Sequence, residues 1–137
     1  MKIFIDTNVV IDVLLKREKF YESSRNVLVL CEKKLAKGFI SAASITDIFY
    51  IVNRQLHDKE KTICEISKML SFLNVVKIDG RLINSAIKSG WSDFEDCIQF
   101  YAARSKKVSF IITRNEKHFI NSKIKVINPD DFISILI

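Results

Sequence analysis

The sequence predicts an α/β fold in which a central parallel sheet carries helices on both faces. Short apolar runs alternate along the chain with longer segments of helical periodicity, which is the pattern of βαβ units. The chain of 137 residues is 48% apolar, enough for one substantial core. With three Gly and one Pro, it favours long regular elements over a scaffold rich in loops. We therefore expect a single domain over residues 1–137.

The predicted strands are short and mostly apolar, because a parallel strand covered by helices buries both of its faces. The first of them begins at Lys2 and ends just before Asp6. The expected strands are 2–5, 39–41, 75–78, 110–113 and 125–127.

Helices are predicted where apolar residues recur every three or four positions. In the segment 21–37 this pattern places Leu35 inward, and Gly38 fits a C-terminal stop. In the segment 59–73 it places Ile63 and Leu73 on the apolar face. The expected helices are 8–15, 21–37, 45–55, 59–73, 81–89 with Gly90 as its stop, 94–105, and a short helix from Asp130.

The chain is basic, with a net charge of +6 and a pI near 9.3. A positive surface favours a polyanionic partner, since Lys and Arg neutralise phosphates and release counterions. Charge alone does not decide this, because many basic proteins bind no nucleic acid. The basic residues Lys16, Arg17 and Lys19, like Lys106 and Lys107, fit either an RNA-facing rim or ordinary solvated turns.

Cysteine usage and the N-terminal run indicate a cytoplasmic protein with no membrane partner. Cys31, Cys64 and Cys97 are far apart and form no CxxC pair, which favours reduced thiols over a disulfide framework or a zinc site. The first apolar run is interrupted by Asp6 and Asp12 and lacks a small-residue cleavage site, so it is a poor signal peptide. No stretch approaches the ~20 apolar residues of a transmembrane helix.

Acidic and amide side chains recur where the predicted strands end or the helices begin. Because the carboxyl ends of parallel strands form the ligand crevice of such a sheet, these side chains can converge on one edge. Clustered carboxylates need a cation or a proton, and Mg²⁺ takes oxygen ligands, polarises a phosphodiester and makes a bound water more acidic. The candidates are Asp6 after the first strand, Asp47 in the helix after the second, Asp93 and Asp96 at the start of 94–105, and Thr113-Arg114-Asn115 after the fourth strand.

Each of these acids also fits a helix cap, and the sequence leaves both roles open. In two segments the pattern is that of a capping box, in which a Ser and an acid three residues later satisfy each other's amides. The capping candidates are Asp6, Asp47 with Ser44, Glu95 with Ser92 as the better match, Asp93 as a second cap, and Asp96 as a favourable charge at the helix start.

Four segments, taken together, resemble the motifs of the PIN-domain family. They are KIFIDTNVVIDVL, ISAASITDIFYIV, GWSDFEDCIQFYAA and FIITRNEKHF. The first is a strand running into an Asp-Thr-Asn turn, and the second is a strand leading into a helix that carries an acid. The third is an Asp opening a helix of small and apolar residues, and the fourth is a strand ending in Thr-Arg-Asn. They occur in the family's order across nearly the whole chain, which implies a compact α/β nuclease dependent on Mg²⁺ or Mn²⁺.

The resemblance also implies a role for each matched position. It implies catalytic, metal-binding acids at Asp6, Asp47 and Asp96, with Asp93 as a further metal-binding acid one helical turn earlier. Arg114, which adjoins the fourth position, fits either a phosphate contact or a solvated charge after a strand. The implied supporting residues are Thr7 and Asn8 at the first metal site, Thr113 as a hydroxyl behind the acids, and Asn115 at the fourth position.

Two of these positions depart from the family's pattern. The second acid is usually Glu, and here it is the shorter Asp47; the fourth position is often acidic, and here it is the neutral Asn115. Both changes favour weaker metal binding, or one ion in place of two. The leading hypothesis is a metal-dependent endoribonuclease, and the alternative is a PIN-like RNA-binding module with weakened catalysis.

The resemblance extends to partners. Many single-domain PIN proteins of similar length form the VapC-like group, the toxins of toxin–antitoxin pairs. Membership of that group implies an RNA substrate, a homodimer and a small antitoxin protein.

Two further side chains have two interpretations each, and a third has one. His118 fits either a substrate contact or an exposed position on a short helix, and His57 is expected to be exposed in a loop. Trp91 fits core packing better than stacking on a base.

Overall fold

The core of the molecule is a parallel sheet whose strand order is β3-β2-β1-β4-β5. The computed structural model describes residues 1–136, and Ile137, the last residue of the predicted domain, lies outside the described residues. All neighbouring strands pair in parallel, with Phe4 opposite Phe39 on one side and Ile111 on the other. The strands are β1 (Lys2–Ile5), β2 (Lys37–Ser41), β3 (Leu73–Val76), β4 (Phe110–Ile112) and β5 (Lys125–Ile127).

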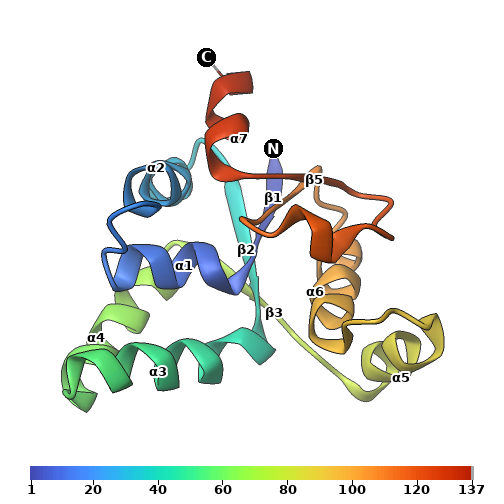
Figure 1. The fold of residues 1–137 in the computed structure, drawn as a ribbon, viewed down its shortest axis with the longest axis horizontal. Coiled ribbons are helices and arrows are strands. Elements are labelled where there is room, and N and C mark those ends of the chain that lie inside the picture. The colour runs from blue at the N-terminus through green and yellow to red at the C-terminus, as the bar shows by residue number, and fades with distance from the viewer. Residues whose placement is uncertain (137) are drawn as a thin grey trace.

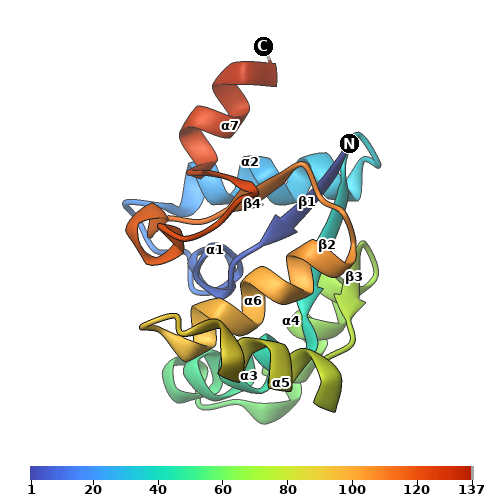
Figure 2. The same ribbon diagram turned by 90° about the vertical axis from the view of Figure 1, so that its right-hand side faces the viewer.

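Helices cover both faces of this sheet, as predicted (Figure 1). One face is packed by α1 (Thr7–Leu14), α2 (Tyr21–Glu32), α3 (Ala42–Leu56), α4 (Lys59–Leu70) and α7 (Pro129–Leu136). The other face is packed by α6 (Phe94–Ser105), which α5 (Gly80–Ser89) covers in turn (Figure 2). A short 3₁₀ helix, η1 (Glu116–Phe119), follows β4.

The elements on the second face agree closely with the prediction because their ends carry local signals. Helix α5 ends at Gly90, whose φ of 74° is the left-handed conformation that favours glycine. Its first turn is capped by Asp79, whose carboxylate accepts a hydrogen bond from the Leu82 amide at 2.9 Å. Helix α6 has the predicted bounds, and so has β5.

The predicted end of the second helix is wrong. Helix α2 ends at Glu32, the left-handed residue after it is Lys34, and Leu35 is 68% exposed. Gly38 is a residue of β2, where a Cβ atom would stand 2.6 Å from both the Cys31 Sγ and a methyl carbon of Leu73. This glycine therefore allows helix and strand to approach closely and terminates no helix.

The predicted boundary between α4 and β3 is also wrong. The helix ends at Leu70 and Ile63 is exposed on it, while Leu73 opens the strand opposite Gly38. Pairing with β2 sets this register, and a one-residue slip would turn every side chain to the other face. The apolar run 69–78 contains the end of one element and the start of the next, which periodicity alone does not separate.

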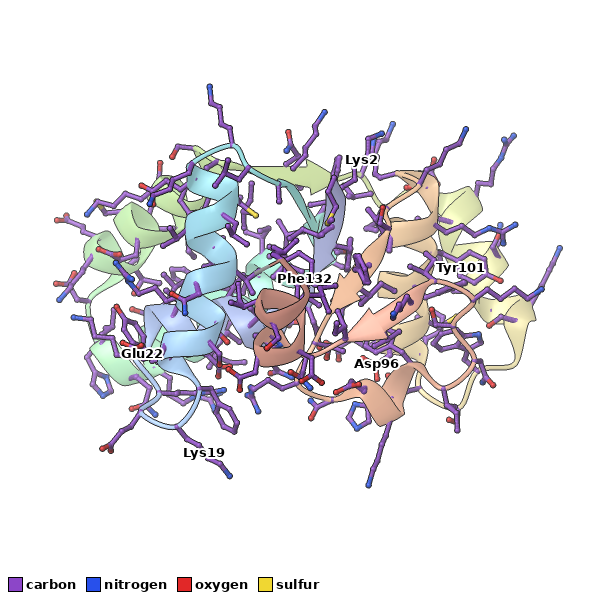
Figure 3. All side chains as sticks on the ribbon, turned by 90° about the horizontal axis from the view of Figure 1, so that it is seen from above. Lys2, Lys19, Glu22, Asp96, Tyr101 and Phe132 are labelled. Carbon is purple, nitrogen blue, oxygen red and sulfur yellow. The ribbon has the colours of Figure 1, made fainter. Side chains whose placement is uncertain are left out.

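The parallel arrangement brings the carboxyl ends of the strands to one edge of the sheet. Seen from above, Lys2 at the start of β1 lies on the opposite side of the molecule from Asp96 and Lys19 (Figure 3). The residues that follow β1, β2 and β4 therefore lie near the start of α6. Across residues 1–136, none of the helices is both long enough and apolar enough to span a membrane.

Candidate active site

A pocket of about 400 Å³ opens at this edge of the sheet. It collects side chains from β1 and α1, from α3, from the start of α6 and from the segment after β4, which are far apart in the sequence. Its lining residues are Asp6, Thr7, Asn8, Ile11, Asp47, Ile51, Asp93, Glu95, Asp96, Gln99, Asn115 and His118. The structure therefore brings together all four predicted acids.

Asp6 is held by the segment after β4. Asp6 is only 4% exposed, and its Oδ2 accepts a hydrogen bond of 2.6 Å from the Thr113 hydroxyl. That hydroxyl oxygen in turn accepts one of 3.0 Å from the Asn115 amide. Although Asp6 occupies the N-cap position of α1, its carboxylate accepts no capping bond from the described amides, so the capping alternative is wrong for its side chain.

The second acid comes from α3. That helix begins at Ala42, and its N-cap is Ser41, whose hydroxyl accepts from the Ala43 amide at 3.1 Å. The proposed capping box between Ser44 and Asp47 is therefore wrong, and Asp47 lies exposed in the second turn. The Thr7 hydroxyl donates to the Ser44 hydroxyl at 2.7 Å, which fixes the start of α1 against α3.

Three further carboxylates belong to the first turn of α6 and the residue before it. Asp93 is the N-cap, as one of the alternatives predicted, and accepts a hydrogen bond of 2.9 Å from the Asp96 amide. The capping box of Ser92 with Glu95 is wrong, since the helix begins one residue later than that box requires. Glu95 instead lines the pocket.

Asp96 is the least satisfied of these acids. Asp96 is 8% exposed, and its buried Oδ2 accepts no hydrogen bond of good geometry from any residue in the range 1–136. His118 Nδ1 lies 3.2 Å from the same oxygen and forms an ion pair with it when the imidazole is protonated. An unpaired oxygen of a buried carboxylate is costly, and a cation supplies what is missing.

The acids raise one another's proton affinity. Burial raises the pKa of Asp96 from 3.8 to about 6, and the carboxylates of Asp93 and Asp6 add to the shift against a lowering by His118. Burial also raises the pKa of Glu95, with Asp47, Asp93 and Asp6 as the charges that add to it. The pocket thus carries excess negative charge, which a bound cation would neutralise.

The donor set suits a hard divalent cation, because the ligands that it offers are carboxylate oxygens, amide oxygens and one unpaired Asp96 oxygen. Within residues 1–136, no three His, Cys, Asp or Glu side chains already stand at the spacing of a metal site. The acids therefore frame the pocket without forming a complete coordination shell. Asp47 is exposed at the rim of the pocket, and exposed Asp93 uses its Oδ1 for the cap of α6.

The structure also places the aromatic and basic side chains that the sequence singled out. Trp91 stacks on Phe100 with ring centroids 5.1 Å apart, which confirms core packing. His118 is exposed on η1 and lines the pocket, and exposed His57 is the left-handed C-cap of α3. Arg114 donates from Nε to Asp12 Oδ2 at 2.6 Å, so its predicted phosphate contact stays a prediction.

Sequence reasoning missed Glu95 and Gln99 at this pocket. Glu95 was assigned to a cap, although it lies between Asp93 and Asp96 in a single helical turn, which was the available signal. Gln99 lies one turn after Asp96 and Glu95, on the face of α6 that lines the pocket, and the helical period could have found it.

A family model described as the PIN domain matches residues 2–117. The chain belongs to the PIN domain family. It is 23% identical over 136 residues to Ribonuclease VapC1 of Aquifex aeolicus, with 96% of this chain and 92% of that protein covered.

Solved structures of PIN proteins share the fold. A toxin–antitoxin complex from Klebsiella pneumoniae matches with a TM-score of 0.68 at 20% identity, covering 92% of this chain and 96% of that one. VapBC2 from Rickettsia felis, solved with a DNA fragment from its promoter, matches with a TM-score of 0.66 at 20% identity, covering 93% and 98%. The predicted PIN-like α/β fold is thereby confirmed.

Proposed function

We propose that this PIN domain is a metal-dependent endoribonuclease that hydrolyses RNA phosphodiesters. The observation that carries the proposal is the pocket of five carboxylates, in which burial and mutual repulsion raise the pKa of Asp96 to about 6. Such a cluster is stable in its ionised form only with a cation, and a cation beside a phosphate is the basis of metal-assisted hydrolysis. The similarity to a protein named as a ribonuclease supports the same reaction.

Asp6, Asp47 and Asp96 are the residues that we assign to holding Mg²⁺ or Mn²⁺, with Asp93 as a further ligand. When bound, the ion supplies neutralisation of the phosphate charge and a more acidic water. Thr113 holds one oxygen of Asp6 in place, at 2.6 Å. Thr7 fixes the start of α1 through Ser44, and the amide side chains of Asn8 and Asn115 give the pocket neutral polar groups that repel no phosphate.

Glu95 can supply the negative charge that the two departures from the family's pattern remove. Asp47 is shorter than the usual Glu and Asn115 is neutral, so both positions contribute less negative charge than expected. Glu95 lies near enough to Asp47 for that carboxylate to raise its pKa. We assign Glu95 to the role of an added acid that restores the charge of the pocket.

The partners follow from the same assignment. A net charge of +6 favours a polyanion such as RNA. The solved relatives are described as a toxin–antitoxin complex and as VapBC2, and we propose that this chain is likewise a cytoplasmic toxin, acting as a homodimer and restrained by a small antitoxin protein.

The test is cleavage of a mixed RNA pool by the purified protein at fixed salt, with Mg²⁺, with Mn²⁺ and with a chelator, beside Asp6→Asn. We expect cleavage that requires a divalent ion and disappears in the variant, while the variant still binds RNA. Binding without cleavage under every ion would replace the proposal by the RNA-binding module. Absence of both activities from protein freed of any co-purified antitoxin would remove both.

A further inference from the structure

We propose that the ion pair between Arg114 and Asp12 is a positioning device, which holds the segment after β4 against the acids of the pocket. This inference rests on the proposed nuclease function and assigns a role to two residues outside the pocket lining. Asp12 lies on α1, one helical turn after Asn8, and Arg114 lies between Thr113 and Asn115.

Asp12 is a fully buried carboxylate that the protein itself satisfies. Its exposed fraction is 0%, and Arg114 Nε donates to Oδ2 at 2.6 Å. The Ser24 hydroxyl from α2 donates to the same oxygen at 3.2 Å, and Arg17 Nη1 lies 3.4 Å from Oδ1. The chain therefore surrounds one negative charge with two cations and a hydroxyl, which is the arrangement that burial of a charge requires.

Arg114 is fixed on a second side by an aromatic ring. Its guanidinium carbon lies 4.0 Å from the centroid of the Phe20 ring, within the range of a strong cation–π contact. Its side chain is 18% exposed, compared with 37% for Arg17. Arg114 is therefore the more buried of the two cations on Asp12.

The segment that Arg114 anchors touches two of the proposed metal-binding acids. On one side of Arg114, the Thr113 hydroxyl donates to Asp6. On the other side, the Asn115 carbonyl accepts from the His118 amide at 3.0 Å, and the His118 imidazole lies 3.2 Å from Asp96. One anchored residue thus lies between the contacts to the acid after β1 and the acid on α6.

Helix α1 connects the anchor to the pocket directly. Its first residues, Thr7 and Asn8, line the pocket, and its second turn carries Asp12. Because a helix is stiff over two turns, fixing Arg114 to Asp12 sets the distance between the start of α1 and the segment after β4. A loop that supplies site residues needs such support, since small displacements of supporting groups cost metal affinity and rate.

The variants that test this role are Asp12→Asn, Arg114→Met and Arg114→Lys, with Arg17→Met as the matched control on the same carboxylate. Mn²⁺ affinity is measured by calorimetry, and amide hydrogen exchange of residues 113–119 is followed in the metal-free protein. We expect Asp12→Asn and Arg114→Met each to weaken Mn²⁺ binding about tenfold and to speed exchange in that segment. Arg114→Lys should recover part of the lost Mn²⁺ affinity. Arg17→Met should change affinity and exchange little, because the ion pair of Arg17 with Asp12 is partly exposed.

The double variant and RNA binding give the decisive comparisons. The double variant Asp12→Asn with Arg114→Met should bind Mn²⁺ no more weakly than either single variant, since both substitutions remove the same interaction. RNA affinity in chelator should keep its salt dependence in both variants. If Arg114→Met alone weakened RNA binding and lowered the salt slope by about 1, Arg114 would be a phosphate contact and the inference would be overturned.

The remaining outcomes separate this inference from the proposed function. If amide exchange of residues 113–119 and Mn²⁺ affinity are both unchanged in folded Asp12→Asn and Arg114→Met, the positioning role is overturned while the nuclease stays intact. A wild-type protein that neither binds Mn²⁺ nor cleaves RNA overturns the proposed function, and hydrogen exchange of residues 113–119 then decides the positioning role by itself.

Discussion

Two buried carboxylates, on helices that pack opposite faces of the sheet, differ in the charges that surround them. Asp12, on α1, is 0% exposed and is neutralised by Arg114 and Arg17 with a hydroxyl besides. Asp96, on α6, is 8% exposed, and its Oδ2 accepts no hydrogen bond from the described residues. It faces other carboxylates, with the exposed imidazole of His118 at 3.2 Å as its cationic partner when protonated. The first carboxylate has two arginine partners, whereas the second has one titratable imidazole among several carboxylates.

The contrast shows that burial of a charge does not by itself indicate function. A buried ion pair serves structure when its partners come from the protein, as at Asp12. A buried carboxylate among other acids raises the free energy of the folded state unless an outside cation binds. The imbalance at Asp96, more than its burial, is the reason we propose the pocket as a cation-binding site.

The sharpest test of the contrast is the effect of neutralising each carboxylate on cleavage. Asp96→Asn should lower turnover about 1,000-fold, equivalent to roughly 4 kcal/mol, because under the proposed function it removes a ligand of the ion. RNA affinity in chelator should stay close to that of the wild type. Single-turnover cleavage with Mg²⁺ gives the rate. If Asp93→Asn were inactive while Asp96→Asn kept full activity, the assignment of the third acid would have to move to Asp93.

The second test compares stability, where the order of the two sites reverses. Asp12→Asn should destabilise the fold by about 2 kcal/mol, because Arg114 and Arg17 then lose their buried counter-charge. Urea unfolding with an unchanged m-value measures this loss. Asp130→Asn, at an exposed position in the first turn of α7, is the control for removal of one negative charge. A loss at Asp12 no larger than at Asp130 would show that the buried pair contributes nothing.

The same two sites show what the sequence could predict. Asp6 and Asp96 were located because strand ends and helix starts are local features, and parallel strands bring them to one edge. The pair of Asp12 and Arg114 joins residues 102 apart in sequence, and nothing local indicates that contact. Arg114 was therefore assigned to solvent or phosphate, although the fold gives it a carboxylate partner.

The fold itself was predictable to a similar extent and for the same reason. Helix α6 with its cap at Asp93, and α5 with its stop at Gly90, carry their own boundary signals. Gly38 does not: its role depends on Cys31 and Leu73 packing against it, which is a tertiary contact. Element types were therefore predicted well, whereas boundaries set by packing were not.

The third test follows the pH dependence of stability in chelator. The pKa of Asp96 is raised from 3.8 to about 6 in the folded state, so the folded protein holds a proton that the unfolded chain releases between these values. The stability that protonated Asp96 contributes to the folded state is fully present below about pH 4, and it is lost as the pH rises through about 6.

Asp96→Asn removes the fall in stability that ionisation of Asp96 causes. After allowance for solvent screening, it should stabilise the metal-free protein at pH 7 by roughly 1–2 kcal/mol, and it should have little effect near pH 4. Thermal unfolding across this range measures the difference, and Mn²⁺ should reverse it by stabilising the wild type alone. An equal effect of the substitution at pH 4 and pH 7 would show that ionisation of Asp96 is not its cause.

The smallest expected effect separates the two roles of Asp93, which is both a helix cap and a member of the acidic pocket. Asparagine caps a helix about as well as aspartate, so Asp93→Asn should leave stability within a few tenths of a kcal/mol, whereas Asp93→Ala should cost about 1 kcal/mol through loss of the bond to the Asp96 amide. Both variants remove the charge, and both should therefore lower the pKa of Asp96 equally and weaken Mn²⁺ binding equally. If Asp93→Asn kept full Mn²⁺ affinity while Asp93→Ala lost it, Asp93 would serve the pocket only by ordering α6, and the negative charge that distinguishes Asp96 from Asp12 would come from Asp6 and Glu95 alone.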